Sequence, residues 1–271
     1  MTSRRTALIV LPAALALAAC ASSTAPGRGT VGSAGSSNPA APSSGGATPT
    51  TATDLGTALR AGMQTVRSAH LTLEVGVGGQ TINGQGDEQV DNGKLSNLQL
   101  SETLPGAGEL GVVIVGDKTY VKLPPAIRHG SGKPWTLVTA DSTNPVIQQM
   151  AASIASARSS ASLDTIKDFA QAASSVTVKG AATVAGADTT HYSMVVDTGK
   201  LPSTFPGIDA LKKTGLTRIP VELYVDHQGR PVEVDENVTV QGQTVTTKIT
   251  VTRYNQPVTI TAPPADQVSS G

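Results

Sequence analysis

Aromatic residues are scarce in this chain: two Phe, four Tyr and one Trp occur in 271 residues. Aromatic rings normally supply much of the buried area of a hydrophobic core, whereas here Val, Leu, Ile, Ala and Thr are plentiful. A domain built from such slim side chains either packs its layers closely or leaves space inside. Composition alone leaves both alternatives open.

The chain has a single cysteine, Cys20. An intrachain disulfide is thereby excluded, although an extracytoplasmic compartment would permit one. The folded part therefore depends on its core alone for stability.

Neither sign of charge is in excess, since 20 Lys and Arg stand against 20 Asp and Glu. Removing Arg4 and Arg5 with an N-terminal signal leaves 18 basic against 20 acidic residues, a net charge of −2. A protein that binds nucleic acid would carry a basic stripe, so we expect no nucleic-acid partner. Long apolar runs are also lacking, because no segment approaches the length of about 20 residues that spans a bilayer.

The apolar run that does occur is typical of a lipoprotein signal peptide. Arg4 and Arg5 precede Ala7–Ala19, 13 residues that are too short to span a bilayer as a helix. Leu17-Ala18-Ala19-Cys20 reads as a lipobox. We predict that residues 1–19 are removed and that Cys20 is lipidated, which anchors the protein to the outer face of the cell membrane. Two or three chains such as palmitate make a stable anchor, because each buried CH2 contributes about 0.8 kcal/mol. An ordinary signal peptide with an incidental cysteine is the alternative.

Residues 20–53 are predicted to be the lipidated cysteine and a disordered tether. Ala21–Thr53 consists almost wholly of Ser, Thr, Gly, Ala and Pro, and such a segment cannot bury enough apolar surface to offset the entropy of ordering. As a flexible coil it would span about 30 Å. Whether it is O-glycosylated stays open.

Residues 54–268 are predicted to form one folded domain. Asp54 is expected to cap a helix over Leu55–Ser68, whose apolar side chains share one stripe. Alternation of apolar and polar residues, with Gly-, Asn- and Asp-containing turns between the runs, then predicts a series of strands. These are His70–Val77, Thr81–Val90, Lys94–Leu104, Glu109–Val115, Lys118–Leu123 and Trp135–Val138.

The periodicity changes in the middle of the chain, where helices are predicted over Asn144–Ala157 and Leu163–Ala173. A loop or short helix is expected over Leu201–Thr214, and Gln267–Gly271 should fray. The remaining predicted strands are Ser175–Lys179, Ala181–Ala185, Asp188–Asp197, Ile219–Val225, Val232–Val240 and Val245–Val251. This order predicts an α+β fold: a strongly curved antiparallel β-sheet, or half-barrel, with helices covering its concave, open face.

Several segments carry a resemblance through their order and spacing. After the lipobox, the tether and the first helix come Val115–Leu123 (VGDKTYVKL) with Pro134-Trp135, then Val196–Leu201 (VDTGKL), then Ile219–Pro231 (IPVELYVDHQGRP). Together these resemble the LppX/LprA/LprF/LprG group of mycobacterial and actinobacterial envelope lipoproteins over most of Asp54–Val268.

The resemblance implies a half-barrel similar to LolA and LolB, with an apolar cavity between sheet and helices. In that group the cavity holds acyl chains of glycolipids, phospholipids or long-chain waxes, which the protein carries across or presents in the envelope. An envelope lipid transporter is then a candidate partner. The group has no catalytic motif to carry over, and its members differ in ligand, so the lipid is not specified.

An apolar strand face could line such a cavity, because each methylene moved there from water gains about 0.8 kcal/mol. A small-residue core without any cavity is the alternative. The expected lining consists of Leu71, Leu73, Val75, Val112, Ile114, Val221, Leu223, Val234 and Ile249. A one-residue slip of register would turn this set outward.

The mouth of the cavity is expected to carry Trp135, Lys212 and Lys213. Trp135 as a plug of the core, and the lysines as a solvated surface, are the alternatives. Because closed strands alone offer no entry, Asn144–Ala173 and Leu201–Thr214 are expected to shift as a lid.

No pattern in the chain points to a catalytic or metal site, and we expect no cofactor. Zinc sites need clustered ligands, whereas the histidines are dispersed; no G-x-S-x-G elbow or phosphate-binding glycine motif occurs. Two small acidic groups are interpreted as solvated strand edges. The histidines are His70, His129, His191 and His227, and the acidic groups are Asp87, Glu88 and Asp91, and Glu233, Asp235 and Glu236.

We therefore predict a monomeric, non-enzymatic lipoprotein, anchored in the membrane, that binds acyl lipids or glycolipids and carries or presents them in the cell envelope. A non-enzymatic envelope scaffold that binds a protein partner is the second hypothesis. A hydrolase is the third, and it would need a convergent nucleophile and base.

Overall fold

The computed structural model describes residues 47–270 except residues 92–93, 126–127, 129–131, 140–141, 143–146, 149–150, 152–162, 206–207 and 241. The predicted signal peptide, Cys20 and most of the tether lie outside these residues, as does most of the helix predicted over Asn144–Ala157. No helix in the described part of the chain is both long and apolar enough to cross a bilayer.

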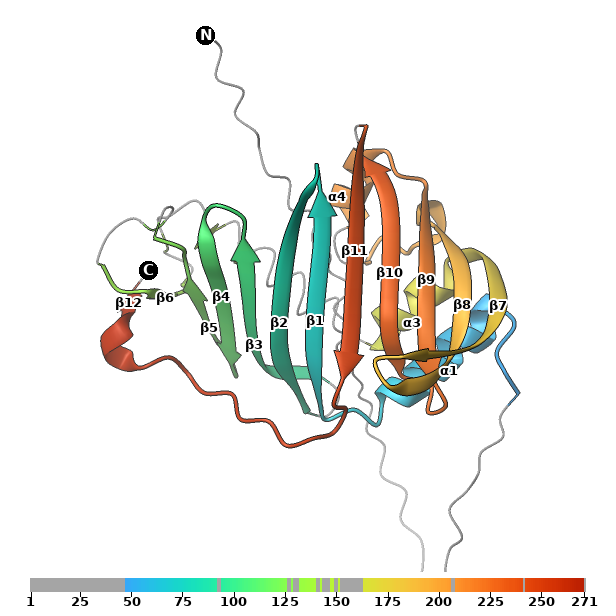
Figure 1. The fold of residues 1–271 in the computed structure, drawn as a ribbon, viewed down its shortest axis with the longest axis horizontal. Helices are drawn as coiled ribbons and strands as arrows, with labels where there is room; N and C mark the ends of the chain where they lie inside the picture. Colours follow the sequence, from blue (N-terminus) through green and yellow to red (C-terminus); the bar gives the residue numbers. More distant parts are fainter. Residues whose placement is uncertain are drawn as a thin grey trace, which may run out of the picture.

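In the described part of the chain, twelve strands form one open sheet in the order β12-β6-β5-β4-β3-β2-β1-β11-β10-β9-β8-β7 (Figure 1). Neighbouring strands are antiparallel except β6 and β12, which are parallel. The strands are β1 Ser68–Val77, β2 Gln80–Asp91, β3 Lys94–Leu104, β4 Gly108–Val115, β5 Lys118–Lys122, β6 Trp135–Leu137, β7 Ala173–Val184, β8 Ala187–Asp197, β9 Arg218–Asp226, β10 Pro231–Val240, β11 Gln243–Thr252 and β12 Val268–Ser270.

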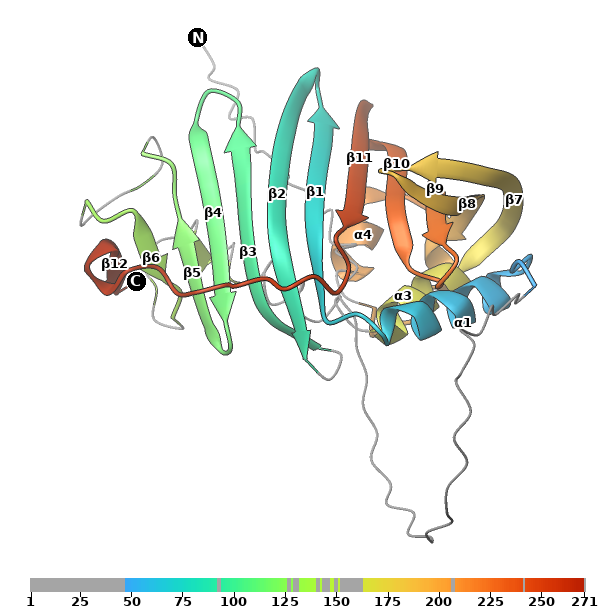
Figure 2. The same cartoon turned by 60° about the horizontal axis from the view of Figure 1, so that its bottom comes forward.

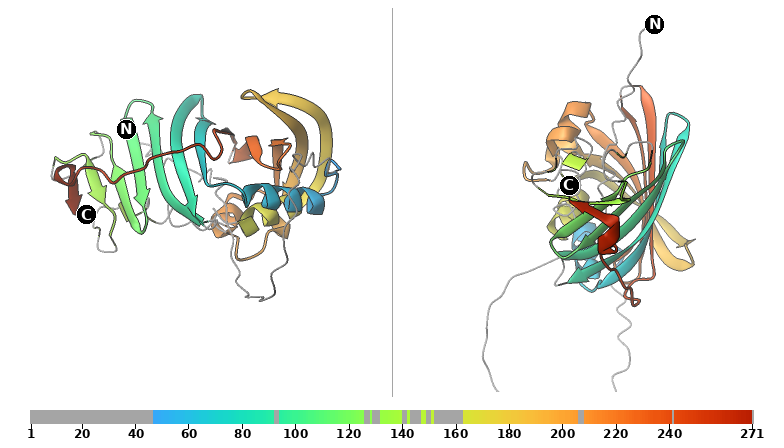
Figure 3. Two further views of the ribbon diagram at one scale, coloured as in Figure 1. Left: turned by 90° about the horizontal axis from the view of Figure 1, so that it is seen from below. Right: turned by 90° about the vertical axis from the view of Figure 1, so that its left-hand side faces the viewer.

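The sheet is strongly curved, and the helices lie on its concave side near β7–β11 (Figures 2 and 3). These helices are α1 (Ala52–Met63), α3 (Leu163–Gln171) and α4 (Ile208–Thr214), with short 3-10 turns at Thr198–Lys200 and Ala265–Gln267. The predicted fold class, a curved antiparallel half-barrel with helices on its concave face, is confirmed.

Helix α1 starts earlier than predicted, because Thr51 rather than Asp54 is its N-cap. The Thr51 hydroxyl oxygen accepts a hydrogen bond from the Asp54 backbone N–H at 3.1 Å, which satisfies one of the free donors of the first turn. Asp54 instead lies inside that turn, where its charge favours the positive end of the helix dipole. The helix ends at Met63, and Ser68 already belongs to β1.

Strand β7 is one strand where two were predicted. Gly180, the residue taken as the break, stays within the strand at a positive φ of 121°, and the pairing with β8 shifts between Val178 and Gly180. A glycine adopts this conformation without steric cost. The result is a β-bulge that bends the strand without ending it.

The main core lies between the helices and the strands from β1 through β11 to β7. Its buried members come from every one of these elements and are almost all aliphatic, with Tyr192 and Phe169 as the aromatic exceptions. The most enclosed are Leu55, Met63, Val66, Val196, Val221 and Val251. The scarcity of aromatic residues is therefore met here by close packing of small side chains.

Helix α1 touches the β9–β10 turn through two glycines. A Cβ atom at Gly62 would lie 2.4 Å from the carbonyl carbon of Gly229, and one at Gly229 would lie 2.5 Å from the Ala58 carbonyl oxygen. Gly229 also has a φ of +79°. Only glycine at both positions permits this approach of helix and turn.

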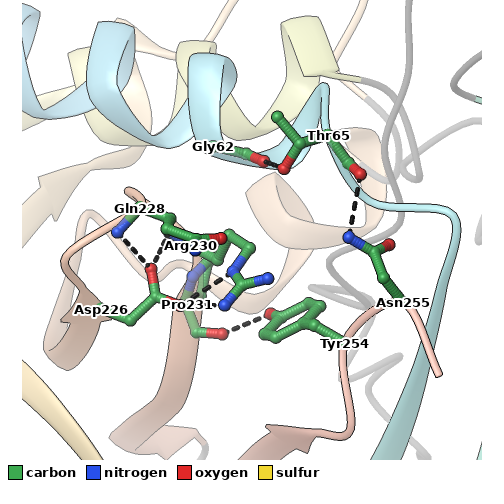
Figure 4. Close-up of polar contacts among 8 residues, drawn as sticks. All are labelled: Gly62, Thr65, Asp226, Gln228, Arg230, Pro231, Tyr254 and Asn255. Carbon is green, nitrogen blue, oxygen red and sulfur yellow. Dashed lines mark hydrogen bonds and ion pairs between the residues drawn. The ribbon is translucent and has the colours of Figure 1, made fainter. Parts of the chain in front are cut away.

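The same turn is held by a buried carboxylate (Figure 4). Asp226 accepts hydrogen bonds at 2.9 Å from the backbone N–H groups of Gln228 and Arg230, and its other oxygen lies 2.7 Å from the Arg230 guanidinium. The Tyr254 ring lies under that guanidinium at 4.5 Å, and its hydroxyl donates to the Pro231 carbonyl. The turn is thus fixed from both sides.

The chain after β11 runs as a strap, residues 253–267, across the outside of the sheet (Figure 2). The carbonyl of Val258 accepts a hydrogen bond from the Gln89 side chain at 2.9 Å, and Ile260 is buried against Val113 and Tyr120. The prediction that Gln267–Gly271 frays is wrong for Val268–Ser270, which form β12 and pair with β6; Gly271 lies outside the described residues. Two contacts hold the C-terminal segment in place: the burial of Ile260 and the Lys133–Val268 hydrogen bond of 2.9 Å. The local sequence did not reveal either of them.

Candidate functional site

The register of the sheet places all nine predicted lining residues on one face. We call this the inner face and define it by those nine residues; the opposite face is the outer face. Leu73 lies opposite Ile249, Ile249 opposite Val234, and Val234 opposite Leu223. Since side chains alternate across a strand, Leu71, Val75, Val221, Val112 and Ile114 follow on the same face.

Near α1 and α3 the inner face is filled by side chains. Val221, Leu223 and Val234 contact residues of α1 and α3 around a gap of only about 20 Å³. A gap of this size accommodates about one water molecule, so it holds no acyl chain. In this conformation, the predicted space between helices and sheet is closed at these three residues.

The other half of the inner face lies on β2–β4. Val112 and Ile114 are buried, with Leu98 and Leu100 half-buried beside them. Val112 and Ile114 belong to none of the hydrophobic clusters formed by the described residues, whereas Leu71 and Val221 belong to the main core.

Two glycines shape this half. Gly86 lies between Leu71 and Leu100, and a Cβ there would meet the Gln99 carbonyl oxygen at 2.2 Å. Gly84 lies between Leu73 and Glu102. At these two positions of β2 the inner face therefore carries backbone atoms only, whereas a packed core would have side chains there.

Three glutamates interrupt the apolar inner face. Glu88 lies between Ala69 and Leu98, Glu102 beside Gly84, and Glu236 beside Val221. Burial raises the pKa of Glu88 from 4.5 to about 8 and that of Glu236 to about 7, and it raises the pKa of Glu102 as well. One carboxyl oxygen of Glu88 and one of Glu236 are buried without a hydrogen-bond partner.

The interpretation of both acidic groups as solvated strand edges is therefore wrong. Both groups lie on interior strands of the sheet, β2 and β10, and Glu88 and Glu233 are buried while Glu236 is half-buried. Glu88 is only 1% exposed, and its neighbour Asp87 points to the outer face, where it lies 2.8 Å from His70. Likewise Glu236 faces inward while Asp235 is on the outer face, 3.9 Å from Lys248. Two consecutive acids on a strand must point to opposite faces, and this was the signal that could have identified the inward pair.

Trp135 lies on the outer face, away from the proposed lining. It stands opposite Lys122, its ring lies above Gly111, where a Cβ would be 3.1 Å from the ring, and it packs with Val113 and Tyr120. Lys212 and Lys213 are exposed in the last turn of α4. The structure thus does not bring the tryptophan to the face that carries the lining.

Among the described residues, the outer face holds a cluster that contains the residue types of a hydrolase. Glu222 accepts hydrogen bonds from Ser193 at 2.8 Å and contacts His191 Nε2 at 2.6 Å, while the His191 ring stacks on Tyr224 at 4.3 Å. The serine hydroxyl is directed to the carboxylate and not to the imidazole, whereas an activated serine needs the base within hydrogen-bond reach. His227 is exposed in the β9–β10 turn, as predicted. Within the described residues, no group of three or more metal-ligating side chains is found.

No family model matches the sequence, and no curated protein matches it. Solved structures that are similar include the lipoprotein LppX of Mycobacterium tuberculosis, at 13% identity and a TM-score of 0.49, covering 76% of this chain and 98% of LppX. LprF of Mycobacterium bovis is similar at 15% identity and a TM-score of 0.47, with 78% and 96% covered. The chain also matches the MucA/MucB complex of Pseudomonas aeruginosa at 14% identity and a TM-score of 0.37, covering 81% of this chain and 61% of that one.

The resemblance inferred from the sequence is confirmed in that LppX and LprF are among the matching structures. At these identities and TM-scores the likenesses give no basis for assigning a ligand, a partner or an activity to this chain.

Proposed function

We propose that the chain is a non-enzymatic, lipid-anchored lipoprotein that binds acyl chains on the inner face of its sheet and carries or presents lipids on the outer side of the cell membrane. The lipobox ending at Cys20 supports the anchor. The tether of about 30 Å would keep the domain close to the bilayer from which a lipid is taken.

The observation that carries the proposal is the β2–β4 half of the inner face. The inner-facing residues there are apolar: Val112 and Ile114 are buried, and Leu98 and Leu100 are half-buried. Gly86 adds no side chain to this part of the face. A methylene chain laid on such a surface gains about 0.8 kcal/mol for each CH2 removed from water. A palmitoyl chain therefore has ample driving force, even after its ordering cost.

The acyl chain of the ligand would enter through a movement of the predicted lid. Its described parts include α3, α4, which ends in the exposed Lys212 and Lys213, and Ile147, which is buried against Val121 and Leu123. A shift of α3 would also open the closed region at Val221 and Leu223, so that the whole predicted lining could serve longer chains.

The test uses one inward and one outward substitution on the same strand. Leu100→Arg places a charge on the inner face, whereas Gln99→Arg places it on the exposed outer face one residue away. Binding of a fluorescent dipalmitoylglycerol should be lost in L100R and kept in Q99R, provided both fold as judged by circular dichroism. Native mass spectrometry of wild-type protein from an actinobacterial host should show co-purified lipid. Lipid-free protein that also ignores the probe would refute the proposal.

The anchor is tested separately. A Cys20→Ser variant should leave the membrane fraction and appear in the soluble extracytoplasmic fraction, while wild-type protein stays with the membrane. Equal membrane retention of both would show that Cys20 is incidental.

A protein-binding scaffold remains the second candidate, favoured by the closed packing of α1 and α3 on Val221 and Leu223. That packing is what a core without a ligand would show. If the lipid probe fails while a partner is captured from the envelope with purified protein and survives L100R, the scaffold function replaces the first proposal.

A further inference from the structure

The two ends of the sheet differ in the charges they carry. Because neighbouring strands are antiparallel, the β1–β2, β3–β4 and β10–β11 hairpins lie at one end, where α4 also lies (Figure 1). The β2–β3, β4–β5, β7–β8 and β9–β10 turns lie at the other end, where α1 contacts the β9–β10 turn. We call these the α4 end and the α1 end.

At the α1 end, acids and bases occur together. Asp117 precedes Lys118 in the β4–β5 turn, and Asp226 lies 2.7 Å from Arg230 in the β9–β10 turn. The three hairpins of the α4 end contain no charged residue; they are Val77–Gln80, Leu104–Gly108 and Val240–Gln243. A surface that approaches the α4 end therefore meets no acid on these hairpins.

Four exposed cations lie at the α4 end, and we call them the basic patch. They are Lys200, Lys212, Lys213 and Arg218. The backbone brings their segments together, because the Thr198 N–H donates to the Thr217 carbonyl at 3.1 Å and the Thr198 hydroxyl donates to the Leu216 carbonyl at 2.8 Å. The 3-10 turn that ends at Lys200 is thereby joined to the segment between α4 and β9.

Within the described residues, the cations of the basic patch form no ion pair and no side-chain hydrogen bond. By contrast, Lys122 lies 3.0 Å from Glu109 and Lys248 lies 2.9 Å from Glu233. The patch is thus left with its charge available to a partner.

Two acids accompany the basic patch in the sequence from Asp197 to Arg218. Asp197 accepts a hydrogen bond from the Gly199 N–H at 2.9 Å, and Asp209 lies in the first turn of α4, whereas Lys212 and Lys213 lie in its last turn. Four positive and two negative charges leave an excess of two positive charges in this segment. The chain without its predicted signal peptide has a net charge of −2, so the excess at the α4 end is opposite in sign to that of the whole.

An anionic bilayer is the partner that fits this distribution. Each Lys or Arg close to an anionic membrane surface strengthens binding about fivefold, and the attraction decays within about 8 Å at physiological ionic strength. Only the end that faces the membrane therefore contributes. Since the whole chain is weakly negative, attraction requires that the α4 end face the bilayer.

We propose that the basic patch docks the α4 end of the domain on anionic phospholipid headgroups. This inference rests on the proposed function for the location of the domain beside a membrane, and it adds an orientation that a flexible tether does not set. Helix α4, a part of the predicted lid, then faces the bilayer.

The length of the tether permits this orientation. Strand β11 has 10 residues and is therefore about 34 Å long, which gives the scale of the distance between the two ends. The tether residues Ala21–Thr50, which precede the cap of α1, can extend to about 100 Å. An anchor at Cys20 therefore does not prevent the α4 end from reaching the membrane.

The test uses the chain from residue 20 onward with Cys20→Ser, which removes the acyl anchor. Cosedimentation is measured with vesicles of phosphatidylcholine alone and with vesicles of equal parts phosphatidylcholine and phosphatidylglycerol. The C20S protein should bind only the anionic vesicles, and added salt should weaken this binding. Adding K212Q/K213Q should weaken it about 25-fold, because two cations are lost. K200Q/R218Q is a second pair with the same expected effect and serves if the first does not fold.

K94Q/K118Q is the matched control. Both lysines are exposed at the α1 end, so this pair changes the net charge by the same amount but should leave vesicle binding unchanged.

A fluorescent label tests the orientation directly. Cys20 is the only cysteine, so the C20S protein accepts a single label at an introduced cysteine. An environment-sensitive fluorophore at Thr217→Cys, beside the basic patch, should shift to shorter wavelength on anionic vesicles. The same fluorophore at Ala61→Cys, exposed on α1, should not shift.

Three results would each overturn the docking proposal: no binding of C20S protein to anionic vesicles, equal loss of binding in the patch and control variants, or equal shifts at both labels. Each leaves the proposed function standing, because acyl binding is measured separately with the fluorescent dipalmitoylglycerol. Failure of that probe to bind, with vesicle docking retained, would instead overturn acyl binding and support the docking surface alone.

Discussion

Glu88 makes the stability of this protein depend on pH in a direction opposite to that of most carboxyl groups. Burial raises its pKa from 4.5 to about 8, while the unfolded chain restores a value near 4.3. Between these values the native state binds more protons than the unfolded state, so stability falls as pH rises. The contribution is fully present below about pH 4.3 and is lost as pH passes through about 8.

The size of this effect on the free energy of unfolding follows from the difference between the two pKa values of Glu88. One pKa unit corresponds to about 1.4 kcal/mol, so the change from 4.5 to about 8 sets an upper bound of about 5 kcal/mol. Within the native state the neighbouring Arg230–Asp226 pair is held at 2.7 Å, and burial keeps the pKa of Tyr254 well above its ordinary value. The pKa of Glu88, about 8, lies within the pH range over which unfolding can be measured.

Urea unfolding, followed by circular dichroism between about pH 5 and about pH 9, measures this directly. The Glu88→Gln variant removes the titrating group, so its free energy of unfolding, relative to wild type, should rise by several kcal/mol across that range. Glu74→Gln, exposed on the outer face, should follow wild type at every pH. A constant difference between E88Q and wild type would refute the buried, neutral state of Glu88.

Three further substitutions test the contacts that fix the fold. Gly62→Ala should lower the free energy of unfolding by about 1–3 kcal/mol or more, because its Cβ would lie 2.4 Å from Gly229; an unchanged urea midpoint would contradict this approach of helix and turn. Asp226→Asn should cost about 3 kcal/mol by leaving the Arg230 guanidinium buried and unpaired, and a loss below about 1 kcal/mol would argue against that pairing. Ile260→Ala should cost about 2 kcal/mol or more and speed amide exchange in β12, whereas unaltered exchange would mean that the strap does not hold the C-terminal strand.

The strands were predictable because their alternation is strict and their turns carry glycine. Strand β3 has the predicted bounds Lys94–Leu104, and the register places the whole predicted lining on one face. Gly78 and Gly79, which join β1 to β2, both adopt positive φ, as a tight hairpin requires. Local pattern and tertiary pairing agree in this part of the chain.

The errors arose where tertiary contacts decide between local alternatives. Thr51 and Asp54 are both good caps, and only the path of the chain makes Thr51 the first residue. Gly180 could end a strand or form a bulge, and continued pairing with β8 selects the bulge. For β12 the deciding contacts come from Lys133 and β6, more than 130 residues away in sequence, so no local pattern could reveal them.

The two halves of the inner face differ in a way that stability does not explain. Beneath α1 and α3, Val221, Leu223 and Val234 leave almost no space, as expected of a core whose side chains are selected for packing. On β2 and β3 the same face carries Gly84, Gly86 and the inward acid Glu102. Glycine weakens a strand interior, and withdrawing a carboxyl group from water costs free energy. Residues that lower stability at adjacent positions of one apolar surface are expected where a surface is kept for binding, so this half is where the acyl ligand is sought.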